Sequence, residues 1–160
     1  MNRTLLFAAT ALLTMSACDE TDPDDPTGPM PDVTFEWSTE SDPETVALEG
    51  TFPDSQSCGI SVQSPNEGQY FLDFRNFEDE AMIRLRFPDT VDAPPVAGTY
   101  VVSVDVTVDF TLPSPFGVMD GVAGGVLVEE ENGWRKVTVS ADVTNGSEGG
   151  FIDAVLACRI

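Results

Sequence analysis

The chain has 160 residues, of which 28 are acidic and 7 basic, and its formal net charge is −21. That length suits one folded domain, and so negative a surface argues against nucleic acid as a partner, because it would repel the phosphate backbone. The sequence has no histidine, which excludes Ser-His-Asp and Cys-His nucleophile pairs and the usual zinc sites.

The N-terminus has the pattern of an export signal. Arg3 precedes an apolar run from Leu5 to Met15 that is too short for a stable membrane span. Residues 15–18 read Met-Ser-Ala-Cys and resemble the lipobox of bacterial lipoproteins, in which small residues precede a cysteine that becomes the lipidated first residue. The methionine departs from the usual leucine at the first lipobox position, yet it is also a flexible apolar side chain.

This resemblance covers residues 1–18 alone. It implies a signal peptide over residues 1–17, lipidation of Cys18, and a mature protein held on a membrane of the bacterial cell envelope by its lipid anchor. Which membrane and which leaflet stay open. The alternatives are an ordinary secreted protein that is cleaved nearby and an N-terminal anchor that is never cleaved.

Residues 18–32 form an acidic, proline-rich linker that has scarcely any apolar side chain to bury. Such a composition predicts a disordered or extended tether, which spans up to about 45 Å at ~3.3 Å per residue. The linker lacks the alternating aspartates, the central glycine and the terminal glutamate of a calcium-binding loop. We therefore interpret it as a spacer between the lipid and the domain.

Residues 33–160 form the predicted domain, in which apolar and polar residues alternate over short runs. This period of two is typical of strands with one buried face, and no helical run is evident. In the segment 81–87 the alternation leaves Arg84 and Arg86 on the outer face. We expect about nine strands, over residues 33–38, 45–52, 58–63, 70–75, 81–87, 99–112, 117–130, 134–143 and 151–160.

Residues 99–112 predict one long strand with Val102, Val104 and Val106 on the same face. Residues 117–130 are apolar on both faces, and Gly121, Gly124 and Gly125 within this segment predict a bulge or bend where another segment crosses closely. With short connections and polar outer faces, the pattern favours an all-β fold, a small antiparallel β-sandwich, with a β-barrel as the alternative.

The three cysteines of the chain suggest one disulfide. Cys58 shares its strand face with Ile60 and Val62, and Cys158 shares its face with Leu156, so both sulfurs are expected to point toward the core. Export would place them where disulfides persist, and Cys18 is unavailable once it is lipidated. We therefore predict a Cys58–Cys158 bond; the alternative is two free buried thiols, because strand parity gives direction and not separation.

The sequence offers little catalytic chemistry. Two carboxylates can hydrolyse glycosides when they lie about 5 to 10 Å apart, but Asp105 and Asp109 would lie ~13 Å apart along one strand. Residues 78–80 (Glu-Asp-Glu) are the nearest approach to a metal site. Three consecutive residues on a short turn cannot all reach one ion, so we predict no tight metal site. We also predict no cofactor and no catalytic residue.

Five aromatic residues would form a sugar- or peptide-binding surface if several were exposed together. Our interpretation is a lipid-anchored envelope domain that is not an enzyme and that binds a protein or glycan partner or has a structural role. The alternatives are a small carboxylate-dependent hydrolase and a calcium-dependent adhesion or carbohydrate-binding module. The five aromatic candidates are Trp37, Phe71, Phe77, Phe116 and Trp134.

Overall fold

The computed structural model describes residues 31–52, 55–91 and 93–159. These ranges contain ten β-strands and no helix. The predicted signal peptide, Cys18 and the linker up to Met30 lie outside the described residues. The strands are β1 (Thr34–Thr39), β2 (Asp42–Thr51), β3 (Ser55–Ile60), β4 (Gln69–Asn76), β5 (Ala81–Val91), β6 (Gly98–Val101), β7 (Thr107–Leu112), β8 (Gly117–Glu131), β9 (Trp134–Thr144) and β10 (Gly149–Arg159).

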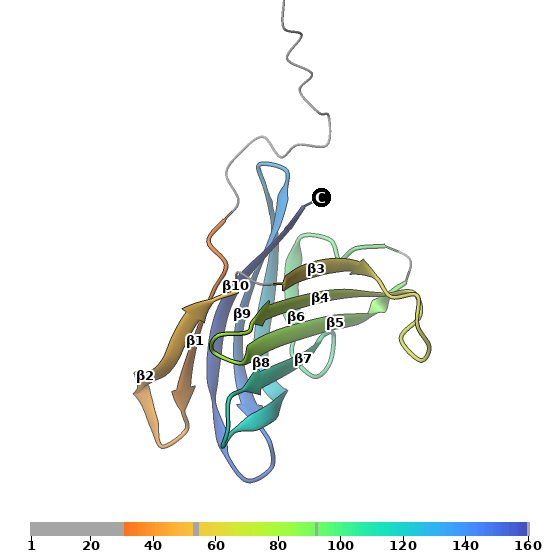
Figure 1. The fold of residues 1–160 in the computed structure, drawn as a ribbon. Coiled ribbons are helices and arrows are strands. Elements are labelled where there is room, and N and C mark those ends of the chain that lie inside the picture. The colour runs from red at the N-terminus through yellow and green to blue at the C-terminus, as the bar shows by residue number, and fades with distance from the viewer. Residues whose placement is uncertain (1–30, 53–54, 92, 160) are drawn as a thin grey trace, which may run out of the picture.

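All ten strands belong to one antiparallel sheet in the order β2-β1-β10-β9-β8-β7-β5-β4-β3, with β6 also paired to β8. The sheet curls on itself, so that β3, β4 and β5 cross in front of β9 and β10 (Figure 1). The edge strand β3 thereby comes into contact with β10. The expected all-β antiparallel fold is confirmed, with ten strands where the sequence predicts about nine.

The core lies between the two halves of the curled sheet. Phe35 on β1 stacks against Phe52, at 4.9 Å between ring centroids, and against Phe110 on β7, at 5.8 Å. Phe52 in turn contacts Phe74 on β4, at 6.2 Å. These four buried rings connect strands from both halves, and aromatic pairs at such distances add about 0.5–1.5 kcal/mol each beyond the area they bury.

The prediction of one long strand over residues 99–112 is wrong. β6 ends at Val101 and β7 begins at Thr107, because the chain makes a tight turn in which Asp105 Oδ2 accepts a hydrogen bond from the Val101 amide at 2.8 Å. Val102 and Val106 are buried on either side of the turn, whereas Val104 at its tip is 68% exposed. The two buried valines are four positions apart, which is an even offset, so the turn leaves the period of two unbroken.

The predicted bulge is confirmed in β8. This strand pairs with β9 along its length, and on its other side first with β7 and then with β6. The register to β9 shifts between Gly121 and Ala123. A Cβ atom at Gly121 would lie 2.9 Å from side-chain atoms of both Val102 and Val108, so the close crossing requires a glycine there.

A disulfide joins Cys58 on β3 to Cys158 on β10, with the Cα atoms 6.3 Å apart and a sequence separation of 100. Cys158 is buried and Cys58 packs against the core from the edge strand. Val62, which was expected on the same inward face, is 85% exposed because β3 ends at Ile60. The bond fastens one edge of the curled sheet to a strand of the opposite half.

Reduction of this bond is expected to destabilise the domain. Closing a loop of about 100 residues is worth up to ~4.7 kcal/mol in the chain-entropy model, and measured losses are commonly about 2–4 kcal/mol. Thermal melting with and without reductant measures the effect, and the Cys58→Ser, Cys158→Ser double variant should not respond to reductant. In the denatured, unreduced Cys18→Ala variant, labelling of two free thiols would contradict the bond.

Candidate functional site

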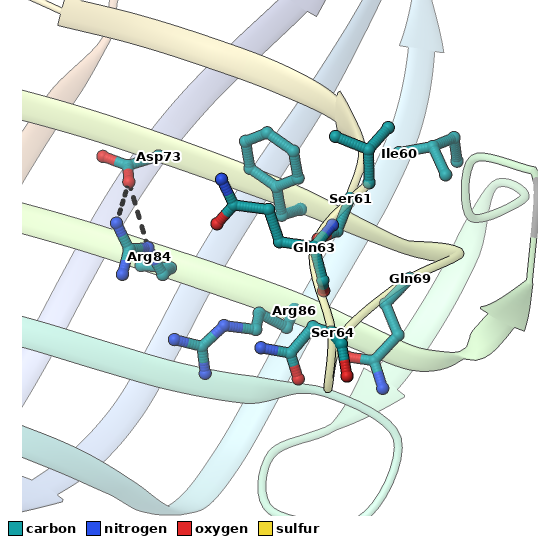
Figure 2. A pocket seen from close by; sticks show the side chains of 11 residues that line it. Ile60, Ser61, Gln63, Ser64, Gln69, Asp73, Arg84 and Arg86 are labelled. Atoms are coloured by element: carbon teal, nitrogen blue, oxygen red, sulfur yellow. Dashed lines mark hydrogen bonds and ion pairs between the residues drawn. The ribbon is translucent and has the colours of Figure 1, made fainter.

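The outer face of β3, β4 and β5 carries a groove of about 400 Å³, which we call the outer-face groove. Asp73, Arg84 and Arg86 lie along its strands, and Gln63 projects over them from the turn that follows β3 (Figure 2). Its volume falls within the range of ordinary small-ligand sites. The groove is lined by Ile60, Ser61, Val62, Gln63, Ser64, Asn66, Gln69, Phe71, Asp73, Arg84 and Arg86.

One wall of the groove is the turn between β3 and β4. Backbone hydrogen bonds from Ser61 to Gln69 and from Gly68 back to Ser61, both 2.8 Å, close this turn at its base. The Asn66 amide also donates to the Gln63 carbonyl at 2.9 Å. The turn therefore holds several amide and hydroxyl side chains beside the strands, where they can donate and accept hydrogen bonds.

The floor of the groove contains an ion-pair network centred on Asp73. Arg84 lies directly opposite Asp73 on β5 and donates to its Oδ2, while Arg75 donates to its Oδ1 at 3.0 Å. Burial by itself would raise the pKa of Asp73, but the hydrogen bonds and positive charges of Arg75 and Arg84 outweigh it, so this pKa lies below its ordinary value. Asp73 is thus a carboxylate at neutral pH.

Three arginines lie at or beside the groove. Arg86 pairs with Asp109 of β7 at 2.9 Å, so three arginines face two aspartates across β4, β5 and β7. The described ranges hold six cationic residues, and these three arginines are half of them. Three arginines against two aspartates are a small local excess of positive charge on a chain whose net charge is −21.

The five aromatic residues considered for a binding surface are not exposed together as one patch. Trp37 is 1% exposed and Phe77 is 64% exposed, while the other three are partly buried. Phe71 lines the outer-face groove, whereas Trp37 and Phe116 line a second cavity at the end of the sheet. The sequence pattern did identify these aromatic residues, but it could not separate one that lines a groove from one that fills the core.

The acidic turn at residues 78–80 is organised by Asn76. The Asn76 side chain donates to Asp79 Oδ2 at 2.7 Å and accepts from the Asp79 amide at 2.9 Å. Within the described residues, no group of three or more Cys, Asp or Glu side chains is placed to hold a metal ion. That residues 78–80 do not form a tight metal site stays a prediction.

No family model, no curated protein and no solved structure matches this chain. Among the residues that the structure describes, no helix is long and apolar enough to cross a bilayer. The function must therefore be argued from the chemistry of the groove.

The arrangement suits binding better than acid–base chemistry. Asp73 and Asp109 flank Arg84 on neighbouring strands, and each of them is engaged by arginine. A glycosidase needs one carboxyl group whose raised pKa keeps it protonated, whereas the pKa of Asp73 is lowered. Sequence reasoning placed Arg84 and Arg86 on the outer face but did not recognise that Arg75 joins them beside the groove.

Replacement of Asp73 should give a pH-dependent loss of stability. Because the folded-state pKa is depressed, the ionised side chain stabilises the fold above its unfolded pKa of about 3.9, and this stabilisation disappears as the pH falls through the folded value. We expect Asp73→Asn to cost roughly 1–3 kcal/mol at pH 7.

Thermal melting of the wild type and of Asp73→Asn between neutral and strongly acidic pH measures this difference. The gap should shrink below a pH of about 4. Asp153→Asn, on the exposed face of β10, is the matched control and should have little effect. A gap that stays constant across the whole pH range would contradict the role given to Asp73.

Proposed function

We propose that this chain is a lipid-anchored lipoprotein of the bacterial cell envelope whose β domain is a non-catalytic binding domain. Its ligand is a saccharide that occupies the outer-face groove. The observation that carries the proposal is the composition of that groove, in which an aromatic ring, several amides and fixed charged side chains surround a volume of about 400 Å³.

The anchor is supported by the N-terminal sequence. An apolar run, a lipobox-like Met-Ser-Ala-Cys and an acidic linker follow one another in the order that lipoproteins require. The acidic domain surface itself would be repelled by anionic headgroups. Attachment to a membrane therefore depends on lipid at Cys18, and the linker gives the domain reach above the surface.

A saccharide fits the groove better than a second protein does. Protein interfaces of ordinary size bury about 800 Å² on each partner, whereas a hollow of about 400 Å³ matches a ligand of one or two rings. Phe71 offers an apolar ring face, and Gln63, Asn66 and Gln69 offer paired donors and acceptors for hydroxyl groups. Arg86 adds a charge that favours an acidic sugar.

The lowered pKa of Asp73 favours binding over the hydrolase alternative. A carboxylate held ionised by two arginines accepts hydrogen bonds from sugar hydroxyls but is a poor proton donor at neutral pH. Its partners also fix its position, since Arg84 and Arg75 donate from two sides. Such a preorganised acceptor loses little freedom when a ligand binds.

The anchor is tested by the mass of the detergent-extracted protein, which should begin at Cys18 and carry thioether-linked diacylglycerol. Two or three acyl chains at ~0.8 kcal/mol per buried CH₂ make release from the membrane negligible. Cys18→Ala should be released into the aqueous fraction, while the Cys58→Ala, Cys158→Ala control stays with the membrane. An unmodified N-terminus, or membrane-bound Cys18→Ala, would refute the anchor.

The groove is tested with the purified full-length protein on a surface of immobilised neutral and uronic-acid oligosaccharides. We expect at least one class to bind, and Phe71→Ala to weaken that binding roughly threefold to tenfold, as the loss of an aromatic contact predicts. Phe151→Ala removes an exposed ring on β10, outside the groove, and should bind as the wild type does.

A second variant shows whether a loss of binding comes from the groove or from misfolding of the domain. Arg86→Gln keeps a hydrogen-bonding side chain at the groove and should weaken uronic-acid ligands more than neutral ones, because it removes the charge. Melting temperatures of all variants show whether the domain is intact. If no oligosaccharide binds, or if folded Phe71→Ala binds as tightly as the wild type, the saccharide proposal fails.

A further inference from the structure

Two Asn-Gly pairs occur in the described part of the chain, Asn132–Gly133 and Asn145–Gly146. Asparagine followed by glycine is the pair most open to spontaneous deamidation, because glycine has no Cβ atom to shield its backbone nitrogen. The pairs lie in the turns at opposite ends of β9, the first at the upper end of the view in Figure 1 and the second at the lower end. The structure holds these two pairs in different ways.

Deamidation requires that the asparagine side chain and the next backbone amide can both move. The glycine nitrogen attacks Cγ of the asparagine, and the new C–N bond closes a succinimide ring. The side-chain amide group leaves as ammonia and takes the proton of the attacking nitrogen with it. Water then opens the ring at either carbonyl group. Opening at the side-chain carbonyl gives aspartate, whereas opening at the backbone carbonyl gives isoaspartate, in which the main chain runs through the side-chain carbon.

The Asn145–Gly146 pair is fixed by hydrogen bonds at both reacting groups. Asn145 Nδ2 donates to the Phe116 carbonyl at 2.9 Å. Its Oδ1 accepts from the backbone amides of two residues that follow in the turn, both at 2.9 Å. The attacking group is also engaged, since the Gly146 amide donates to Thr144 Oγ1 at 3.0 Å. Ring closure at this pair therefore requires several hydrogen bonds to break first.

The Asn132–Gly133 pair has none of these restraints. The two residues form the whole loop between β8, which ends at Glu131, and β9, which begins at Trp134. Their φ angles of 50° and 81° fit a type I′ turn, for which Asn-Gly is the preferred pair. Both residues are exposed, and within the described ranges neither the Asn132 side chain nor the Gly133 amide forms a hydrogen bond. Only the backbone of the turn has to rotate before the two groups meet.

The described chain also has one Asp-Gly pair, Asp120–Gly121, which can form the same ring with loss of water. Asp120 lies opposite Asp109 on β7 and Thr144 on β9, so its strand is paired on both sides. The backbone at this pair cannot rotate while those pairings last. Of the three pairs, the one at Asn132 is therefore the most free to react.

We propose that Asn132 is the modification site at which this protein deamidates in its folded state, with isoaspartate at the tip of the β8–β9 hairpin as one product. Water is the co-reactant, and ammonia is released. The turn contributes no lining residue to the outer-face groove. The modification is therefore independent of the saccharide function.

The two products differ in their effect on the hairpin. Asp-Gly suits a type I′ turn as Asn-Gly does, so aspartate adds a charge and leaves the turn intact. Isoaspartate adds one carbon atom to the main chain, for which a two-residue loop has no place. The second pair below the turn is Glu130 with Arg135, which is buried and bonded to Glu130 at 2.9 Å. Isoaspartate therefore loosens the end of the sheet that carries this ion pair.

The test incubates the purified full-length protein in mildly alkaline buffer, folded in one sample and denatured in another. Peptide mapping by mass spectrometry measures conversion at each asparagine, and isoaspartyl methyltransferase labels the isoaspartate. In the folded protein we expect Asn132 to convert about tenfold faster than Asn145, because the hydrogen bonds of Asn145 must break before the attack. In the denatured protein the two rates should be similar, because glycine follows both residues.

Two variants assign these effects to named contacts. Thr144→Val removes the acceptor of the Gly146 amide and should raise the conversion rate at Asn145, whereas Thr138→Val, in the middle of β9, is the matched control. Asn132→Asp carries the charge of the product without the added main-chain carbon, so it should melt as the wild type does. Protein enriched by chromatography in isoaspartate at position 132 should melt at a lower temperature.

Three outcomes would overturn the proposal. Equal conversion of Asn132 and Asn145 in the folded protein would show that the hydrogen bonds of Asn145 do not protect it. Conversion of Asn132 in the denatured sample alone would show that the type I′ turn prevents the reaction. Isoaspartate-enriched protein that melts like Asn132→Asp would refute the loosening of the hairpin. The comparison of the two sites in the unaltered chain does not depend on any variant folding.

Discussion

The inner face of the sheet must be covered by the sheet itself, because the described chain has no helix to lie against it. A ten-stranded sheet achieves this by curling until β3 contacts β10. Phe35 and Phe110 meet across the interior, and the Cys58–Cys158 bond fixes the edge. The two hollows follow from this constraint, since one lies on the outer face and the other where the curled sheet ends.

The charge of the molecule is distributed unevenly over these surfaces. The acidic side chains repel one another and keep the surface solvated, while Arg75, Arg84 and Arg86 are brought together by neighbouring strands. The charged side chains that line the two hollows therefore differ: Asp73, Arg84 and Arg86 line the outer-face groove, and Glu40 and Glu148 line the second cavity at the end of the sheet.

The period of two was sufficient to predict the strands and the direction of both cysteines, because burial on one face enforces it. It could not detect the turn at Ser103, since Val102 and Val106 keep the same parity with or without that turn. The outer-face groove depends on how the turn at residues 61–69 folds back over β4. Periodicity carries no information on such contacts between segments. It likewise did not predict that Arg135 is buried and pairs with Glu130.

The position of β10 in the sheet has a consequence for the order in which the chain can fold. β10 is the last strand in sequence, yet it stands between β1 and β9, and the β1–β2 hairpin joins the sheet only through it. When the chain emerges from its N-terminus during synthesis or translocation, the β1–β2 hairpin and Cys58 therefore precede the strand that each of them joins in the folded domain. Closure of the domain waits for β10, which follows every other described strand in the chain.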